Sequence, residues 1–140
     1  MKPIKRITLL LSSLFLFACG SHSTASTATI SPTQLQHEWV LINVDGRMIN
    51  TSINSTIKIS TENKASGNLA CNLFFGELIQ QGNEVKITKM GSTRKMCGAD
   101  TMQVESTISN VLNNRSKVSL FEDKLTLTSK SHHLTYQLAK

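Results

Sequence analysis

The chain lacks an apolar segment long enough to cross a membrane as a helix. Its most apolar stretch, Ile7 to Phe17, contains about ten apolar or small residues, whereas a transmembrane helix needs roughly 20. Aromatic residues make up only 5% of the chain, and it contains no internal repeat. These shortages indicate that the stretch is not a transmembrane helix, and they predict one small domain with a modest core.

Motifs for catalysis and for metal binding are missing too. There is no GxSxG, no HExxH and no glycine-rich phosphate loop. The nine acidic residues, Glu105 among them, are scattered over turns, an expected helix and polar strand positions, which predicts that they are solvated. His132 and His133 are neighbours in an expected strand, so their side chains should point to opposite faces and not reach one ion. We predict a protein that is not an enzyme and has no metal or cofactor, with an anion site at residues 92–97 as the alternative.

The N-terminus has the pattern of an export signal. Three basic residues precede the apolar stretch, and Leu16-Phe17-Ala18-Cys19 resembles the bacterial lipobox. Cleavage there would remove residues 1–18 and leave Cys19 as the lipid attachment residue. Three acyl chains, each stabilised by about 0.8 kcal/mol per buried CH₂, would make the attachment effectively permanent. An ordinary signal peptide that happens to contain a cysteine is the alternative.

Residues 19–34 form the expected lipidated N-terminus and a flexible tether rich in serine and threonine. Loss of the signal leaves twelve basic and nine acidic residues, a net charge of +3, so neither the charge nor the compartment favours nucleic acid. The expected partners are the membrane, through the lipid anchor, and an envelope protein. In a Gram-negative cell, Gly20-Ser21 after the anchor predicts the outer membrane, facing the periplasm.

Short alternating segments predict an antiparallel sheet with one wet face. The first expected strand runs from Trp39 to Val44 and ends at the turn signal Asp45-Gly46. The other expected strands cover residues 56–60, 69–79, 84–90, 117–121, 124–129 and 133–138.

One segment, residues 100–115, has a helical period instead. Its apolar residues recur at spacings of three and four, at Val104, Ile108, Val111 and Leu112. Asp100 is a candidate N-cap, with Gln103 at the capping-box position. Residues 35–140 are therefore predicted to form an α+β domain, a mostly antiparallel β-sheet with one α-helix packed on it.

Apart from Cys19, the chain has two cysteines, Cys71 and Cys97. In an oxidising envelope compartment we expect them to form a disulfide. Closing a loop of about 26 residues would contribute roughly 3.5 kcal/mol on the loop-entropy model. Two free buried thiols are the first alternative. A metal or redox pair is the second, although the chain has no CxxC motif.

Five segments together resemble a known family: WVLINVDG (39–46), SGNLACNLFFGEL (66–78), ITKMGSTRKMC (87–97), the expected helix and the closing LTL…LTYQL. In order and spacing they are similar to the META domain of the HslJ-like heat-shock-inducible lipoproteins. The pair Leu69-Ala70 departs from the small residues that are usual before Cys-Asn. Besides the two cysteines, the matching motif residues are Trp39, Asp45, Gly46, Gly67, Asn72, Phe74, Gly76, Ser92 and Thr93.

The resemblance implies a compact, partly open antiparallel β-barrel with one helix, and no catalytic residues. We expect Gly67 and Gly76 to allow tight turns or close strand approach, and Asn72 to bond to local backbone. Either Phe74 or Phe75 should face the core, but not both, because neighbours in a strand alternate.

The expected function is that of a non-enzymatic envelope lipoprotein, a stress-associated binding or maintenance module like relatives linked to heat shock and novobiocin resistance. The alternative is a pilotin-like chaperone that holds an apolar segment of a secretin or other envelope protein. An apolar groove beside the helix would favour the chaperone, and a closed core would favour the maintenance module.

Overall fold

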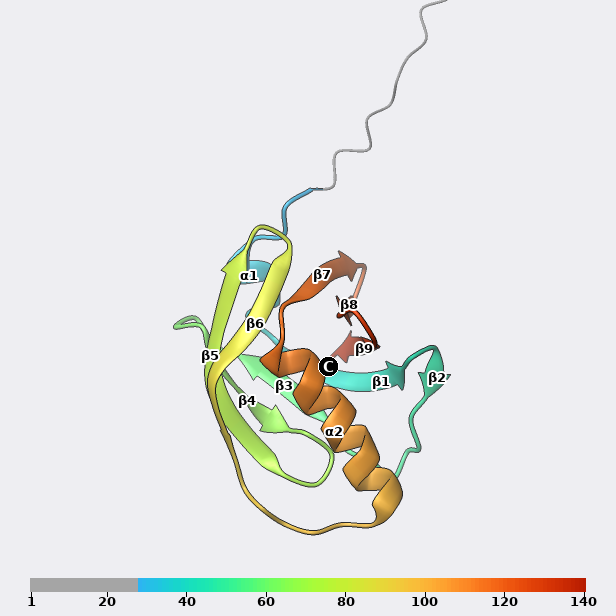
Figure 1. Ribbon diagram of the computed structural model, residues 1–140. Helices are drawn as coiled ribbons and strands as arrows, with labels where there is room; N and C mark the ends of the chain where they lie inside the picture. Colours follow the sequence, from blue (N-terminus) through green and yellow to red (C-terminus); the bar gives the residue numbers. More distant parts are fainter. Residues whose placement is uncertain (1–27) are drawn as a thin grey trace, which may run out of the picture.

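The computed structural model describes residues 28–140 (Figure 1). The expected signal peptide and Cys19 lie outside these residues. Among residues 28–140, no helix is long and apolar enough to cross a membrane. The elements are α1 (Pro32–Leu35), β1 (Glu38–Val44), β2 (Arg47–Met48), β3 (Thr56–Ile59), β4 (Lys64–Asn68), β5 (Leu73–Gln81), β6 (Glu84–Ser92), α2 (Ala99–Asn113), β7 (Ser116–Phe121), β8 (Lys124–Thr128) and β9 (His133–Leu138).

The strands form an antiparallel β-barrel of eight strands, with β2 as an extra strand. β1 pairs with both β3 and β9, which closes the sheet on itself. Asp45 and Gly46 form the two-residue turn between β1 and β2, both with positive φ (53° and 81°), as a type I′ hairpin turn requires. The expected α+β class is confirmed, and the barrel is closed.

One seam of the barrel is short, and the long helix lies beside it. β6 and β7 pair only at Glu84 with Lys117 and at Val85 with Ser116. The rest of β6 diverges from β7, and α2, which connects the two strands, packs against β6 (Figure 1). The helix therefore completes the barrel wall where strand pairing stops.

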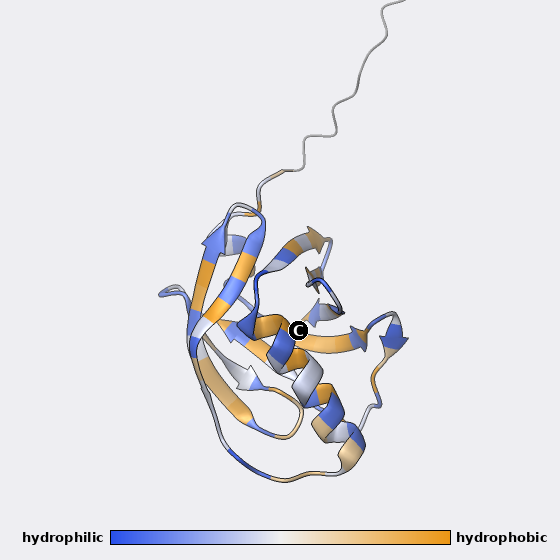
Figure 2. Cartoon of the chain, viewed as in Figure 1, coloured by the Kyte–Doolittle hydropathy of each residue, from blue (hydrophilic) through white to orange (hydrophobic). Residues whose placement is uncertain are grey.

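The core fills the barrel interior and the inner face of α2. Along β5 and β6, hydrophobic bands alternate with hydrophilic ones (Figure 2), as expected for strands with one buried face. The predicted helical stripe is confirmed, since Ile108, Val111 and Leu112 are buried and Val104 packs against the core. Tyr136 is fully buried, and burial raises the pKa of its hydroxyl.

The packed structure begins earlier than residue 35, where the sequence placed the start of the domain. Ile30 is buried in the core, its N–H donates to Asn83 Oδ1 (2.8 Å), and its carbonyl accepts from Gln80 Nε2 (2.7 Å). α1 follows and buries Leu35. A single isoleucine in a polar segment has no period, so its burial was not visible in the sequence pattern.

The strand expected over residues 69–79 is wrong at its start. β4 ends at Asn68, residues 69–72 form a tight connection, and β5 begins at Leu73. Asn68 Oδ1 accepts from the N–H of Ala70 (3.0 Å), a local bond that favours a turn. β4 itself was missed because its sequence, KASGN, contains no large apolar or β-branched residue.

The helix start was also predicted incorrectly. α2 begins at Ala99 with Gly98 as its N-cap, and no side chain caps it. Asp100 therefore does not form the expected capping box with Gln103. It lies in the first turn of the helix, where its negative charge still interacts favourably with the helix dipole.

Candidate functional site

The residue that organises the motif region is Glu105, in the middle of α2. It is 8% exposed, and the prediction that it is solvated is wrong. Its Oε2 accepts hydrogen bonds from the backbone N–H groups of Cys71 (3.0 Å) and Asn72 (2.7 Å), and its Oε1 accepts from Asn72 Nδ2 (2.7 Å). These bonds attach the helix to the connection between β4 and β5. We call this set of bonds the Glu105 clamp.

Asn72 links the clamp to the segment that leads into α2. Its Oδ1 accepts from the Lys95 N–H (2.6 Å) and from Thr93 Oγ1 (2.9 Å), and its Nδ2 also donates to the Lys95 carbonyl (3.2 Å). Thr93 in turn accepts from the N–H of Leu73 (3.1 Å). The expected bonds of Asn72 to backbone are present, but their partner lies 23 residues away rather than nearby.

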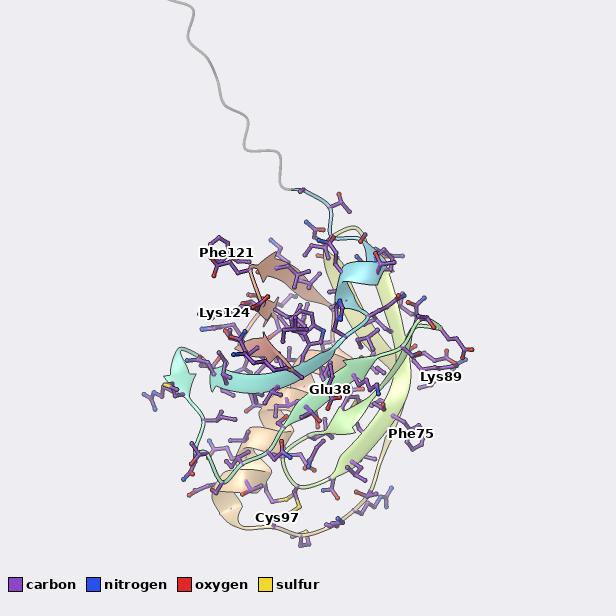
Figure 3. All side chains as sticks on the ribbon, turned by 180° about the vertical axis from the view of Figure 1, so that it is seen from behind. Glu38, Phe75, Lys89, Cys97, Phe121 and Lys124 are labelled. Carbon is purple, nitrogen blue, oxygen red and sulfur yellow. A yellow bond between two sulfur atoms is a disulfide. The ribbon has the colours of Figure 1, made fainter. Side chains whose placement is uncertain are left out.

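The structure joins Cys71 and Cys97 in a disulfide, with 6.1 Å between their Cα atoms. Cys71 is buried next to the clamp, and Cys97 is exposed just before α2. The bond therefore ties the connection 69–72 to the start of the helix, as preferred from the sequence, although Cys71 lies in a turn and not in a strand (Figure 3). The Cys-Asn and Ser-Thr-x-x-x-Cys motifs form one structural unit.

The remaining motif residues are also placed by packing. Trp39 is buried, and its Nε1 donates to the Leu35 carbonyl (3.1 Å), which attaches α1 to the barrel. A Cβ on Gly67 would lie 2.0 Å from the Thr56 carbonyl oxygen, and one on Gly76 would lie 2.5 Å from a methyl group of Ile87. Both glycines therefore permit close strand approach.

The two phenylalanines divide between the core and the surface. Phe74 is 3% exposed and faces the core, whereas Phe75 is 65% exposed (Figure 3). The ring of Phe75 covers Gly91 on the neighbouring strand, where an added Cβ would meet the ring at 2.6 Å. Ser92 pairs with Phe74 at the end of β6. The choice that the sequence left open is thus settled in favour of Phe74.

Asp45 joins the β1–β2 turn to the start of β9. Its carboxylate accepts from the His133 N–H (2.8 Å) and lies 2.7 Å from His132 Nδ1 and 3.7 Å from His133 Nδ1. The prediction that the two imidazoles point apart is wrong, because His132 precedes the strand. Burial acts to raise the pKa of Asp45, but the hydrogen bonds from His132 and His133 outweigh it and lower that pKa below its ordinary value.

A groove of about 740 Å³ lies between the β1–β2 hairpin and α2. Its lining mixes apolar side chains with charged and polar ones, and Met48 at its edge is 85% exposed. The lining residues are Val44, Asp45, Arg47, Met48, Ile49, Asn50, Ile53, Asp100, Gln103, Val104, Thr107 and His132. Within the part of the chain that the structure describes, no group of three or more His, Cys, Asp or Glu residues is placed to hold a metal ion.

Comparison with known families decides the relationship suggested by these motifs. A model of the META domain matches residues 32–140. The chain belongs to the META domain family. It is 32% identical over 130 residues to heat shock protein HslJ of Escherichia coli (strain K12), covering 91% of this chain and 90% of that protein. The family resemblance drawn from the sequence is confirmed.

Two solved structures share the fold of this META domain. One NMR structure has a TM-score of 0.69 and 31% identity, covering 78% of this chain and 95% of its own. A second, from Burkholderia xenovorans, has a TM-score of 0.63 and 22% identity over 96% of this chain and 99% of its own. The first consists almost entirely of the part that matches this chain.

The Glu105 clamp predicts a measurable stability cost for Glu105→Gln. A glutamine amide has one acceptor oxygen, so its NH₂ group would face a buried donor of Asn72 or Cys71. We expect a loss of about 1–3 kcal/mol in the free energy of unfolding, measured by urea denaturation. The control Glu62→Gln changes an exposed turn residue and should stay within about 0.5 kcal/mol of the parent. Equal stability of the two variants would contradict the clamp.

Proposed function

We propose that this META-domain protein is a lipid-anchored, non-enzymatic module of the cell envelope, associated with heat stress, that binds its partner on the outer surface of the barrel. Its relative in Escherichia coli is named a heat shock protein, which supports the stress association. The lipobox-like segment that ends at Cys19 supports the anchor.

The hydrogen bonds made by the polar motif groups are the observation that supports a non-enzymatic role. The Glu105 carboxylate, the Asn72 amide and the Thr93 hydroxyl bond to one another or to backbone. A general base or nucleophile must reach a substrate, whereas the clamp carboxylate faces inward and accepts three bonds. These groups support architecture rather than chemistry.

The cavity in the barrel interior is too small for a ligand, which favours a binding site on the outer surface. The cavity within the core has a volume of only about 30 Å³ and an almost wholly apolar lining, enough for about one water molecule. The groove beside α2 is far larger, but Asp45, Arg47 and Asp100 line it together with apolar side chains. This mixed lining favours a partner with both charged and apolar groups over the purely apolar segment of the pilotin-like alternative.

The binding proposal is tested by photo-crosslinking in intact cells. A photoreactive residue replacing Met48, at the edge of the groove, should give a discrete crosslinked product whose yield rises after heat shock. The same replacement at Phe121, which is 74% exposed and does not line the groove, is the control. Identical products from both positions, or none from Met48, would contradict binding in the groove.

The anchor is tested by Cys19→Ser. Since serine cannot form the thioether to lipid, the variant should lose its acyl chains. A variant whose signal is still cleaved should leave the membrane fraction, whereas one that keeps its signal should show the mass of residues 1–18 and no acyl chains. Cys97→Ser, which removes a different cysteine, should remain with the membranes. Membrane fractionation and the intact mass of the purified protein measure both. Cys19→Ser protein that still carries the mass of the acyl chains and still fractionates with the membranes would rule out lipidation at this residue.

A further inference from the structure

The outer face of β5 carries three exposed apolar side chains in a row. Leu73 is 54% exposed, Phe75 65% and Ile79 47%. They share one face because side chains at even spacing along a strand point the same way, whereas Phe74 and Gly76 face the interior. We call these three residues the β5 stripe. Exposed apolar side chains that gather on one face commonly mark an interaction surface.

Lysines border the stripe on both neighbouring strands. Lys64 of β4 lies 2.9 Å from Glu77, the acidic residue within the row, and Lys89 of β6 lies 3.0 Å from it. The hydrogen bond from Lys64, together with that from Lys89, lowers the pKa of Glu77. The negative charge of Glu77 is therefore paired with the positive charges of these two lysines. Lys86 pairs with Ile79 in register and is exposed. The face therefore carries three apolar side chains, three lysines and one carboxylate, and three positive charges minus one negative charge leave it with a net charge of +2.

The N-terminal segment leaves the barrel at one end of this same strand. Ala28 accepts from Asn83 Nδ2 (3.2 Å) and Ile30 accepts from Gln80 Nε2 (2.7 Å), beside the turn between β5 and β6 (Figure 1). Eight residues, 20–27, lie between Cys19 and Ala28, and the nine steps from one to the other span at most about 30 Å. β5 also has nine residues and a length of about 30 Å. An anchor at Cys19 therefore has enough chain for the whole strand to lie along the bilayer.

We propose that the β5 stripe docks on the anionic phospholipid surface of the bilayer that holds the anchor. The apolar side chains enter the interface between headgroups and acyl chains, and Lys64, Lys86 and Lys89 extend to the lipid phosphates. The orientation rests on the proposed anchoring at Cys19, while affinity for the lipid surface belongs to the stripe itself. Docking this way leaves the groove beside α2 on another part of the barrel, lined by none of these residues.

The test uses residues 20–140, without the anchor, which include every residue that the structure describes; a solved protein of the same fold consists almost entirely of the matched part. We expect this protein to sediment with vesicles of phosphatidylcholine and phosphatidylglycerol, but not with phosphatidylcholine alone, and to be released by high salt. Phe75→Ser should weaken vesicle binding by about tenfold, since losing one inserted ring removes at least that much affinity. Phe121→Ser removes an equally exposed ring far from Phe75 (Figure 3) and should change nothing.

Three results would overturn the proposal. The first is that the protein does not bind the anionic vesicles, and the second is that the two serine variants have equal effects. The third is that the protein does not bind vesicles but forms concentration-dependent dimers in sedimentation equilibrium, and that Phe75→Ser abolishes these dimers. The last would assign the stripe to a second copy of the chain. Absence of acyl chains on Cys19 is read separately, from the mass of the full-length protein, and would refute the anchor without touching the lipid affinity of the stripe.

Discussion

A buried carboxylate, that of Glu105, is the constraint on which the arrangement of this domain depends. A carboxylate out of water is strongly unfavourable unless its oxygens accept hydrogen bonds, so the connection 69–72 must present its N–H groups to α2. Asn72 and the disulfide between Cys71 and Cys97 extend the same attachment to the start of the helix. The helix is thereby held at the short β6–β7 seam, where strand pairing alone leaves the barrel wall incomplete.

The buried polar bonds lie apart from the outer surfaces for which we propose binding roles. Glu105 and Asn72 are buried and their side chains bond to one another and to backbone, and the core leaves space for about one water molecule. The surfaces that differ from ordinary solvated protein lie outside: the mixed groove beside α2 and the basic-edged stripe on β5. Both proposals of binding use these outer surfaces, and both are compatible with a domain tethered by its N-terminus.

Patterns within one element predicted most of the fold, and contacts between elements explain the errors. The alternation of β1, β6 and β7–β9, the helical stripe and the Asp45-Gly46 turn are local signals, and they were confirmed. β4 has no such signal, and Ile30 and His132 acquire their positions from distant strands. Glu105 did carry a signal: it lies three and seven residues before Ile108 and Leu112, on the apolar face of the helix. A carboxylate at that position predicts a buried acceptor.

Hydrogen exchange of the amides of Cys71 and Asn72 tests the central claim most directly. Both donate to Glu105, so in the parent protein they should exchange only when the whole domain unfolds. Their free energy of opening should then equal that of the amides that pair β8 with β9. In Glu105→Gln, we expect these two amides to exchange through local opening while β8 and β9 keep their protection. Rapid exchange of both amides in the parent, or unchanged protection in the variant, would contradict it.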